Sequence, residues 1–133
     1  VDFADAVRDI AGERPIDVVY DGVGRSVFSK SLTVLRQRGM MVTFGNASGP
    51  TGPIDPLVLS TKGSLFLTRP TLANYTATRA DIEEGTGELF GLVRSGKVKI
   101  EVSGRYPLAD AARAHRDLES RRTTGSIVLV PGP

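Results

Sequence analysis

The stretch Gly39-Met-Met-Val-Thr-Phe-Gly-Asn-Ala-Ser-Gly49 decides the fold of this chain. An apolar strand, Met40 to Phe44, ends there in a polar loop that has a glycine at each end. In an open parallel sheet, ligands bind outside the carboxyl ends of the strands, where loop backbone can contact them. The glycines permit close approach, and Asn46 and Ser48 supply donors and acceptors for a phosphate, a ribose or an amide. An ordinary strand-to-loop exit that binds nothing is the alternative interpretation.

The rest of the chain alternates strands and helices, which predicts an α/β fold with a doubly wound parallel sheet. The expected strands are Ile16 to Tyr20, Met40 to Phe44, Ser64 to Thr68, Lys99 to Val102 and Ser126 to Val130. The expected helices are Phe3 to Ala11, Ser26 to Leu35, a short turn at Leu57 to Lys62, Thr78 to Ser95 and Leu108 to Arg121. We expect Ser26 to cap the second helix, which would bury Val27, Leu32 and Leu35.

The composition is that of one small globular domain. Of the 133 residues, 40% are hydrophobic, and the 17 basic and 15 acidic residues are scattered along the chain. This scatter argues against a nucleic-acid partner, because it forms no basic cluster. With no cysteine and one histidine, disulfides, thiolate metal sites and most histidine-rich metal sites are excluded. No apolar run is long enough to span a bilayer, so we expect a cytoplasmic protein without a membrane partner.

A second candidate site, Asp21-Gly-Val-Gly24, follows the first expected strand. A strand, a Gly-x-Gly turn and a helix form the setting of the dinucleotide fingerprint Gly-x-Gly-x-x-Gly. Here Val27 stands where the third glycine belongs, and the acidic residue precedes the glycines. The residues therefore predict either a tight turn or a secondary contact. In the second case, Val23 and Gly24 would place backbone against a nucleotide whose phosphates are held elsewhere.

Several stretches resemble the quinone oxidoreductases, the zeta-crystallin-like, zinc-free branch of the medium-chain dehydrogenase/reductase superfamily. The resemblance covers essentially the whole chain in the same order and spacing. It rests on Ile16 to Gly24, Leu32 to Gly49, Gly63 to Pro70, Tyr106 to His115, Leu118 to Arg121 and Thr124 to Ser126. Its most specific parts are Phe44-Gly-Asn-Ala-Ser-Gly49 and Leu67-Thr-Arg-Pro70.

The resemblance implies the second half of a Rossmann-type doubly wound parallel sheet, followed by a C-terminal strand-helix-strand segment of the substrate domain. Residues 1–97 would form a partial nucleotide-binding domain, and residues 98–133 would return to the substrate domain. Because the chain starts at Val1 within an expected helix, we expect it to be a piece of a longer protein. The glycine-rich phosphate loop would belong to the other piece, so the isolated chain would be inactive.

The resemblance also implies an NADPH-dependent enzyme and a set of cofactor-binding residues. These are Val23 and Gly24 near the nicotinamide; Phe44, Gly45, Asn46 and Ser48 along the cofactor groove; Leu67, Thr68 and Arg69 at the nicotinamide amide, through strand backbone; and Arg121 at the bound nucleotide. The alternatives are a core role for Phe44, a solvated strand-end charge for Arg69 and a helix C-terminal cation for Arg121.

The implied reaction is hydride transfer from the nicotinamide to a quinone or another conjugated carbonyl, a step that the cofactor itself carries. We find no catalytic side chain and no metal ligands, and we interpret His115 as structural. The resemblance further implies a homodimer formed through the edge strand Ser64 to Thr68. An enoyl or alkenal reductase of the same superfamily, and a non-catalytic dimerising half-domain, are the open alternatives. The residues do not specify the electron acceptor or the preference for NADPH over NADH.

Overall fold

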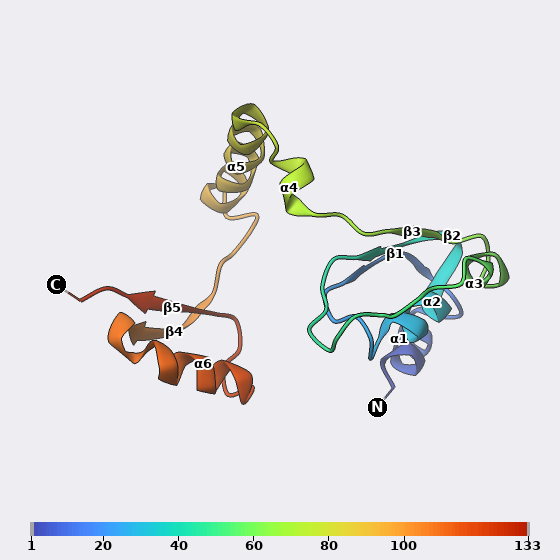
Figure 1. The fold of residues 1–133 in the computed structure, drawn as a ribbon, viewed down its shortest axis with the longest axis horizontal. Coiled ribbons are helices and arrows are strands. Elements are labelled where there is room, and N and C mark those ends of the chain that lie inside the picture. The colour runs from blue at the N-terminus through green and yellow to red at the C-terminus, as the bar shows by residue number, and fades with distance from the viewer. Residues whose placement is uncertain (1, 133) are drawn as a thin grey trace. The chain divides into compact units, whose positions relative to one another are not determined.

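The computed structural model describes residues 2–132 (Figure 1). The chain divides into two compact units, one ending at Ala77 and the other beginning at Thr78. The predicted domain boundary, after residue 97, lies further along the chain than this division. The helix expected at Thr78 to Ser95 therefore falls in the second unit. The assignment of residues 1–97 to a nucleotide-binding domain remains a prediction. Within residues 2–132, every helix is too short or too polar to cross a membrane.

The first unit is built on a parallel sheet with the strand order β1-β2-β3. Its strands are β1 (Ile16–Asp21), β2 (Leu35–Thr43) and β3 (Phe66–Thr68), and its helices are α1 (Phe3–Ala11), α2 (Phe28–Val34), α3 (Leu57–Thr61) and α4 (Leu72–Tyr75). Helices α1 and α2 lie on the same side of this sheet (Figure 1). The prediction of an α/β fold with a parallel sheet is therefore confirmed.

The core lies on one face of this sheet only. Its buried members are Phe28, Leu32, Leu35, Met41 and Leu65, and Val19, Val58, Leu59 and Leu67 pack against them. On the opposite face, Tyr20 is 74% exposed and Phe66 is 58% exposed. Parallel sheets normally have both faces covered. The apolar residues of β1 are therefore half-buried on the core side and exposed on the other.

The prediction that Ser26 caps the second helix is wrong. Helix α2 begins at Phe28, and its N-cap position is Val27, which makes no side-chain cap hydrogen bond. The Ser26 N–H instead donates to Ser48 Oγ at 3.0 Å, a partner from a distant loop. Val27, which we expected to be buried, is only half-buried, and Phe28 is buried in the core instead.

Two further differences lie around β3. The strand begins at Phe66 instead of Ser64, because Ser64 has a left-handed backbone with φ of 55° and cannot join an extended ladder. Leu65 turns into the core, and its N–H donates to Leu59 O at 3.0 Å. Helix α4, a single turn after β3, was not predicted.

The second unit contains α5 (Arg79–Arg94), β4 (Val102–Pro107), a 3-10 turn (Leu108–Asp110), α6 (Ala111–Glu119) and β5 (Ser126–Val130). Strands β4 and β5 pair in parallel, so the expected strand-helix-strand segment is confirmed. The strand expected at Lys99 to Val102 is wrong in position. Val102 already pairs with Ser126, the first residue of β5, so no partner strand reaches back to Lys99.

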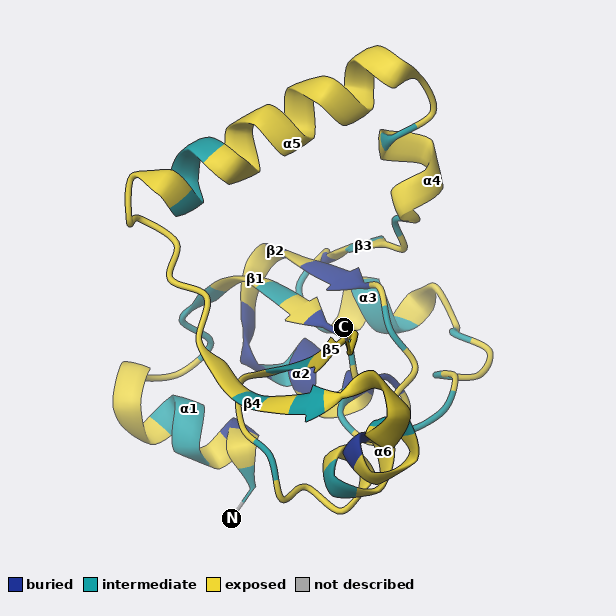
Figure 2. Cartoon of the chain, turned by 90° about the vertical axis from the view of Figure 1, so that its left-hand side faces the viewer, coloured by how far each residue is buried: buried dark blue, intermediate teal, exposed yellow. Residues whose placement is uncertain are grey.

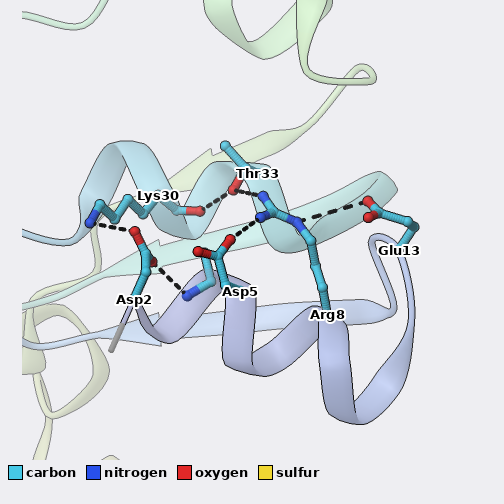
Figure 3. A network of polar contacts seen from close by, with 7 residues as sticks. Asp2, Asp5, Arg8, Glu13, Lys30 and Thr33 are labelled. Atoms are coloured by element: carbon cyan, nitrogen blue, oxygen red, sulfur yellow. Dashed lines mark hydrogen bonds and ion pairs between the residues drawn. The ribbon is translucent and has the colours of Figure 1, made fainter.

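A polar network joins α1 to α2 (Figure 3). Asp2 caps α1 by accepting from Ala4 N at 2.9 Å, and its carboxylate pairs with Lys30 at 2.7 Å. The hydrogen bond from Lys30, together with the one from Ala4 N–H, holds the pKa of Asp2 below its ordinary value. Arg8 adds a hydrogen bond of 3.0 Å to Thr33 Oγ1. The two helices are thus linked by charge as well as by packing.

Arg14, in the loop after α1, forms hydrogen bonds with the C-terminal ends of two other helices. Its Nε donates to Leu35 O at 2.8 Å, and its Nη2 donates to Lys62 O. Leu35 and Lys62 are the C-cap residues of α2 and α3. Carbonyl groups at helix C-termini lack intrahelical donors and favour a nearby cation. Arg14 therefore satisfies both helix ends at once.

We expect Arg14→Met to lower the free energy of unfolding by about 2 kcal/mol, because it removes charge-assisted hydrogen bonds from partly buried carbonyls. Urea denaturation followed by circular dichroism measures this loss. The matched control is Arg36→Met, which removes an exposed ion pair with Asp17 and should cost less than about 1 kcal/mol. Equal losses in the two variants would contradict a structural role for Arg14.

Helix α5 has little tertiary support within the described residues. None of its side chains is buried, and Figure 2 shows it exposed along most of its length. Its start is instead stabilised locally, by Thr78 and Asp81. Asp81 N donates to Thr78 Oγ1 at 3.2 Å, and Thr78 N donates to Asp81 Oδ2 at 2.9 Å, which makes a capping box.

The capping box should weaken in acid. The hydrogen bonds from the Thr78 side chain and backbone lower the pKa of Asp81 from 3.8. A lowered folded-state pKa means that the stabilisation is complete above pH 3.8 and is lost as the pH falls through the folded value. We expect the amide NMR signals of Thr78 and Asp81 to titrate below pH 3.8. In Asp81→Ala, the Thr78 signal should no longer follow this transition.

Candidate functional site

Two loops meet at the carboxyl edge of the first sheet, and their backbones touch. Residues 22–27 follow β1 and residues 44–50 follow β2, and both strands end at the same edge because they are parallel neighbours. A Cβ at Gly45 would lie 2.2 Å from Gly22 O. A Cβ at Gly24, where φ is 84°, would lie 2.6 Å from Gly49 O. Both positions therefore require glycine.

Asp21 organises both loops from the end of β1. Its Oδ1 accepts from Val23 N at 2.8 Å and from Gly24 N at 2.9 Å, which closes the turn after the strand. Its backbone oxygen accepts from Phe44 N at 2.9 Å and Gly45 N at 3.2 Å. The tight-turn interpretation of Asp21-Gly-Val-Gly24 is confirmed, and the contact of Val23 and Gly24 with a cofactor remains a prediction. Asp21 is 3% exposed.

Ser48 joins the two loops through its hydroxyl group. Its Oγ donates to Val23 O at 2.7 Å and accepts from Ser26 N at 3.0 Å. Its own N–H also donates to Val23 O, at 2.8 Å. Because the hydroxyl hydrogen is already used, Ser48 in this arrangement can offer a ligand only an acceptor.

Phe44 and Asn46 point outward from this contact. Phe44 is 54% exposed, and its ring lies over Gly22, whose Cβ position would be 3.2 Å from Phe44 Cε2. The alternative of a core role for Phe44 is therefore wrong in this unit. Asn46 is also exposed. An exposed aromatic face beside an amide side chain is suited to a planar ligand that carries polar substituents.

The end of β3 completes this edge. Leu67 packs its side chain against the core, and Thr68 is exposed at the strand end. The Arg69 guanidinium turns toward β2, where Nη1 lies 3.3 Å from Thr43 O, 3.3 Å from Thr43 Oγ1 and 3.4 Å from Gly45 O. Arg69 is thus more than a solvated strand-end charge, because protein oxygens accept its hydrogen bonds.

All the predicted site residues except Arg121 lie at this one edge. Arg121 belongs to the second unit and follows the end of α6 with a left-handed backbone, φ 56°. Its N–H donates to Leu118 O at 3.1 Å, and the residue is exposed. This is a position for a helix C-terminal cation. A role for Arg121 at a bound nucleotide remains a prediction.

Sequence reasoning missed two residues of this edge. Asp21 was assigned to a tight turn, but the hydrogen bonds by which it holds both loops were not predicted. Thr43 was treated as part of a strand, yet it is 4% exposed and its hydroxyl accepts from Arg69. Among residues 2–132, there is no group of three or more acidic, histidine or cysteine side chains that could hold a metal ion.

Comparisons with known proteins agree with this architecture. Residues 1–129 match the family described as "Zinc-binding dehydrogenase". The chain is 46% identical to "Quinone oxidoreductase 1" of Escherichia coli over 98% of its length, covering 40% of that protein. It is also 46% identical to a 2-haloacrylate reductase of Burkholderia sp over 98% of its length, covering 39% of that protein.

Among solved structures, the quinone oxidoreductase of Escherichia coli in complex with NADPH matches with a TM-score of 0.89 and 45% identity. That match covers 98% of this chain and 41% of the other. The chain therefore spans about two fifths of the length of the relatives that it matches. The predicted second half of a Rossmann-type parallel sheet is confirmed by this likeness.

We expect Gly45→Ala to destabilise the first unit by about 3 kcal/mol, since the new methyl group would force two backbones apart. Gly45 is not among the residues with positive φ, so the cost is purely one of contact. The matched control is Gly12→Ala. Gly12 has φ of 87° and ψ of −176°, a conformation nearly confined to glycine, but open space at its Cβ, so this variant should show backbone strain alone, about 1–3 kcal/mol. Urea denaturation compares them, and a smaller loss for Gly45→Ala would contradict the contact.

Proposed function

Since the chain belongs to the zinc-binding dehydrogenase family, we propose that it forms the C-terminal part of an NADPH-dependent quinone oxidoreductase. The observation that carries this proposal is the likeness to the NADPH complex of the Escherichia coli enzyme, at 45% identity over 98% of this chain. The reaction would be hydride transfer from the nicotinamide to a quinone or another conjugated carbonyl. The cytoplasmic location stays a prediction.

The carboxyl edge of the first sheet fits a nicotinamide nucleotide. Glycines form the contact between the two loops, and they carry no side chain that would keep a ligand away from the backbone. The exposed Phe44 ring offers a flat apolar surface, and Asn46 adds polar groups beside it. We place the nicotinamide half against Phe44, Gly45 and Asn46, with the backbone of Leu67, Thr68 and Arg69 at the carboxamide.

In this proposal, the chain's residues bind and orient, and the cofactor supplies the hydride. Val23 and Gly24 would present backbone beside the nicotinamide, and Ser48 would hold their loop in place. Arg121 would contact the bound nucleotide. The phosphate-binding residues would come from the part of the protein outside this chain, so the chain alone would be inactive.

We also propose a homodimer through β3. This strand is at the edge of the sheet, and Phe66 on it is 58% exposed. An apolar edge strand without a partner favours association with another chain. A second copy that pairs with the strand predicted at Ser64 to Thr68 would extend the sheet and cover this edge.

A reductase of activated carbon–carbon double bonds is the second candidate. The chain is as similar to the Burkholderia 2-haloacrylate reductase as to the Escherichia coli quinone oxidoreductase, at 46% identity each. The described residues therefore do not favour one acceptor over the other. A third possibility, a half-domain that only dimerises, keeps the fold but has no reaction.

Titration with NADPH and NADH, followed by cofactor fluorescence, tests the proposal. We expect the full protein that contains this chain to bind NADPH with micromolar affinity, and the isolated chain to show no binding. Steady-state rates with a quinone, with 2-chloroacrylate and with an enoyl thioester then separate the candidate reactions. Failure of the full protein to bind either nucleotide would overturn the proposed function. Tight binding by the isolated chain would show that the phosphate loop is dispensable.

A further inference from the structure

The inner face of the first sheet changes from apolar to polar at its carboxyl edge, at the last residues of β1 and β2 and at the residue that follows β3. Side chains alternate along a strand, so every second residue points to the same face. Val19, Met41 and Leu67 point to the core, and the next inward positions are Asp21, Thr43 and Arg69. The strand register puts Asp21 opposite Thr43, and Thr68 opposite Val42, so that Arg69 follows at the level of Thr43.

This row holds a carboxylate, a hydroxyl group and a guanidinium. The Asp21 carboxylate is buried, and its Oδ2 has no hydrogen-bond partner among the described residues. The Thr43 hydroxyl between the two charges is buried and accepts from Arg69. Arg69 itself is exposed, and its guanidinium turns toward β2, where the backbone and side-chain oxygens of Thr43 accept its hydrogen bonds.

Arg69 also reaches the loop after β2. With the Asn46 amide oriented to satisfy both of its neighbours, Asn46 Oδ1 accepts from Arg69 Nη2 at 3.2 Å and its Nδ2 donates to Gly45 O at 2.9 Å. Together with the contacts to Thr43, the guanidinium thus holds the residues on both sides of Phe44. The guanidinium contacts these acceptors with two nitrogens held at a fixed separation, a geometry that a lysine ammonium does not reproduce.

We propose that the Arg69 side chain is a positioning residue for the nicotinamide half of the bound cofactor. It acts through Phe44: Arg69 holds Thr43, Gly45 and Asn46, and Phe44 lies among them with its own N–H bonded to Asp21 O. This role is separate from the strand-backbone contact predicted for Arg69. The inference rests on the proposed function, because it takes the ligand at this edge to be NADPH.

The test compares two ligands in the full protein that contains this chain. NADPH carries both halves of the cofactor, and adenosine 2′,5′-bisphosphate carries only the adenosine half. We expect Arg69→Met and Arg69→Lys to raise the Kd for NADPH about tenfold, equivalent to about 1.4 kcal/mol. The Kd for adenosine 2′,5′-bisphosphate should not change. Arg36→Met is the matched control, because Arg36 lies near the other end of β2. It should change neither Kd.

The same contact can be tested from the acceptor side. Thr43→Val keeps the shape of the side chain but removes the hydroxyl group that accepts from Arg69. It should weaken NADPH binding alone, by less than the Arg69 variants do, and Thr43→Ser should restore the affinity. This pair gives a result even if an Arg69 variant fails to fold.

Each outcome decides the inference. A selective loss of NADPH affinity supports it. Equal losses for the two ligands would indicate a general structural role and overturn it, as would unchanged NADPH affinity in the Arg69 and Thr43 variants. If the wild-type full protein binds no NADPH, the proposed function fails first, and this inference fails with it.

Discussion

The contact between Gly22 and Gly45 is the constraint on which the carboxyl edge of the first sheet depends. Neighbouring parallel strands lie about 5 Å apart, and their loops leave on the same side. A Cβ at Gly45 would be only 2.2 Å from Gly22 O, so this approach is possible only without a side chain. Asp21 and Ser48 then fix two loops that already touch. Phe44 follows the inward-facing Thr43, so its side chain points to the opposite, uncovered face and is exposed.

The polar ends of the strands connect stability to the site. A buried polar group is costly unless it is hydrogen-bonded. Thr43 accepts a hydrogen bond from Arg69, and Asp21 Oδ1 accepts two from the following turn. The inward-facing side chains of the sheet are therefore apolar along the strands and become polar or charged at the carboxyl edge. Residues that close the fold and residues that shape the site are neighbours on the same strands.

The elements that rest on local signals were predictable from the sequence. Two elements have the expected bounds, the strand Ser126–Val130 and the helix Phe3–Ala11. The strand is indicated by a run of apolar residues, and the helix by an amphipathic pattern that ends at a glycine, and both signals are local. The Ser26 cap failed because residues 24–27 form a turn, in which Val27 N and Phe28 N both donate to Gly24 O, so that the helix begins only at Phe28.

In the candidate site, too, features that depend on local sequence were predictable, and features that depend on distant contacts were not. The sequence identified the loop after β2 from its glycines and its polar residues. The guanidinium of Arg69 over Thr43 follows from the register of three strands, which no local pattern contains. Likewise, Ser64 offers no sequence signal for a left-handed backbone, so the shorter β3 came only with the fold.

The exposure of α5 has a consequence for where a protease can cleave the chain. This helix begins at Arg79 and ends at Arg94, carries three glycines in between and buries none of its side chains. Exposed backbone with little packing opens locally far more often than a sheet does. A trypsin-like protease would therefore cut here first. The products would be two fragments, each retaining its own parallel sheet.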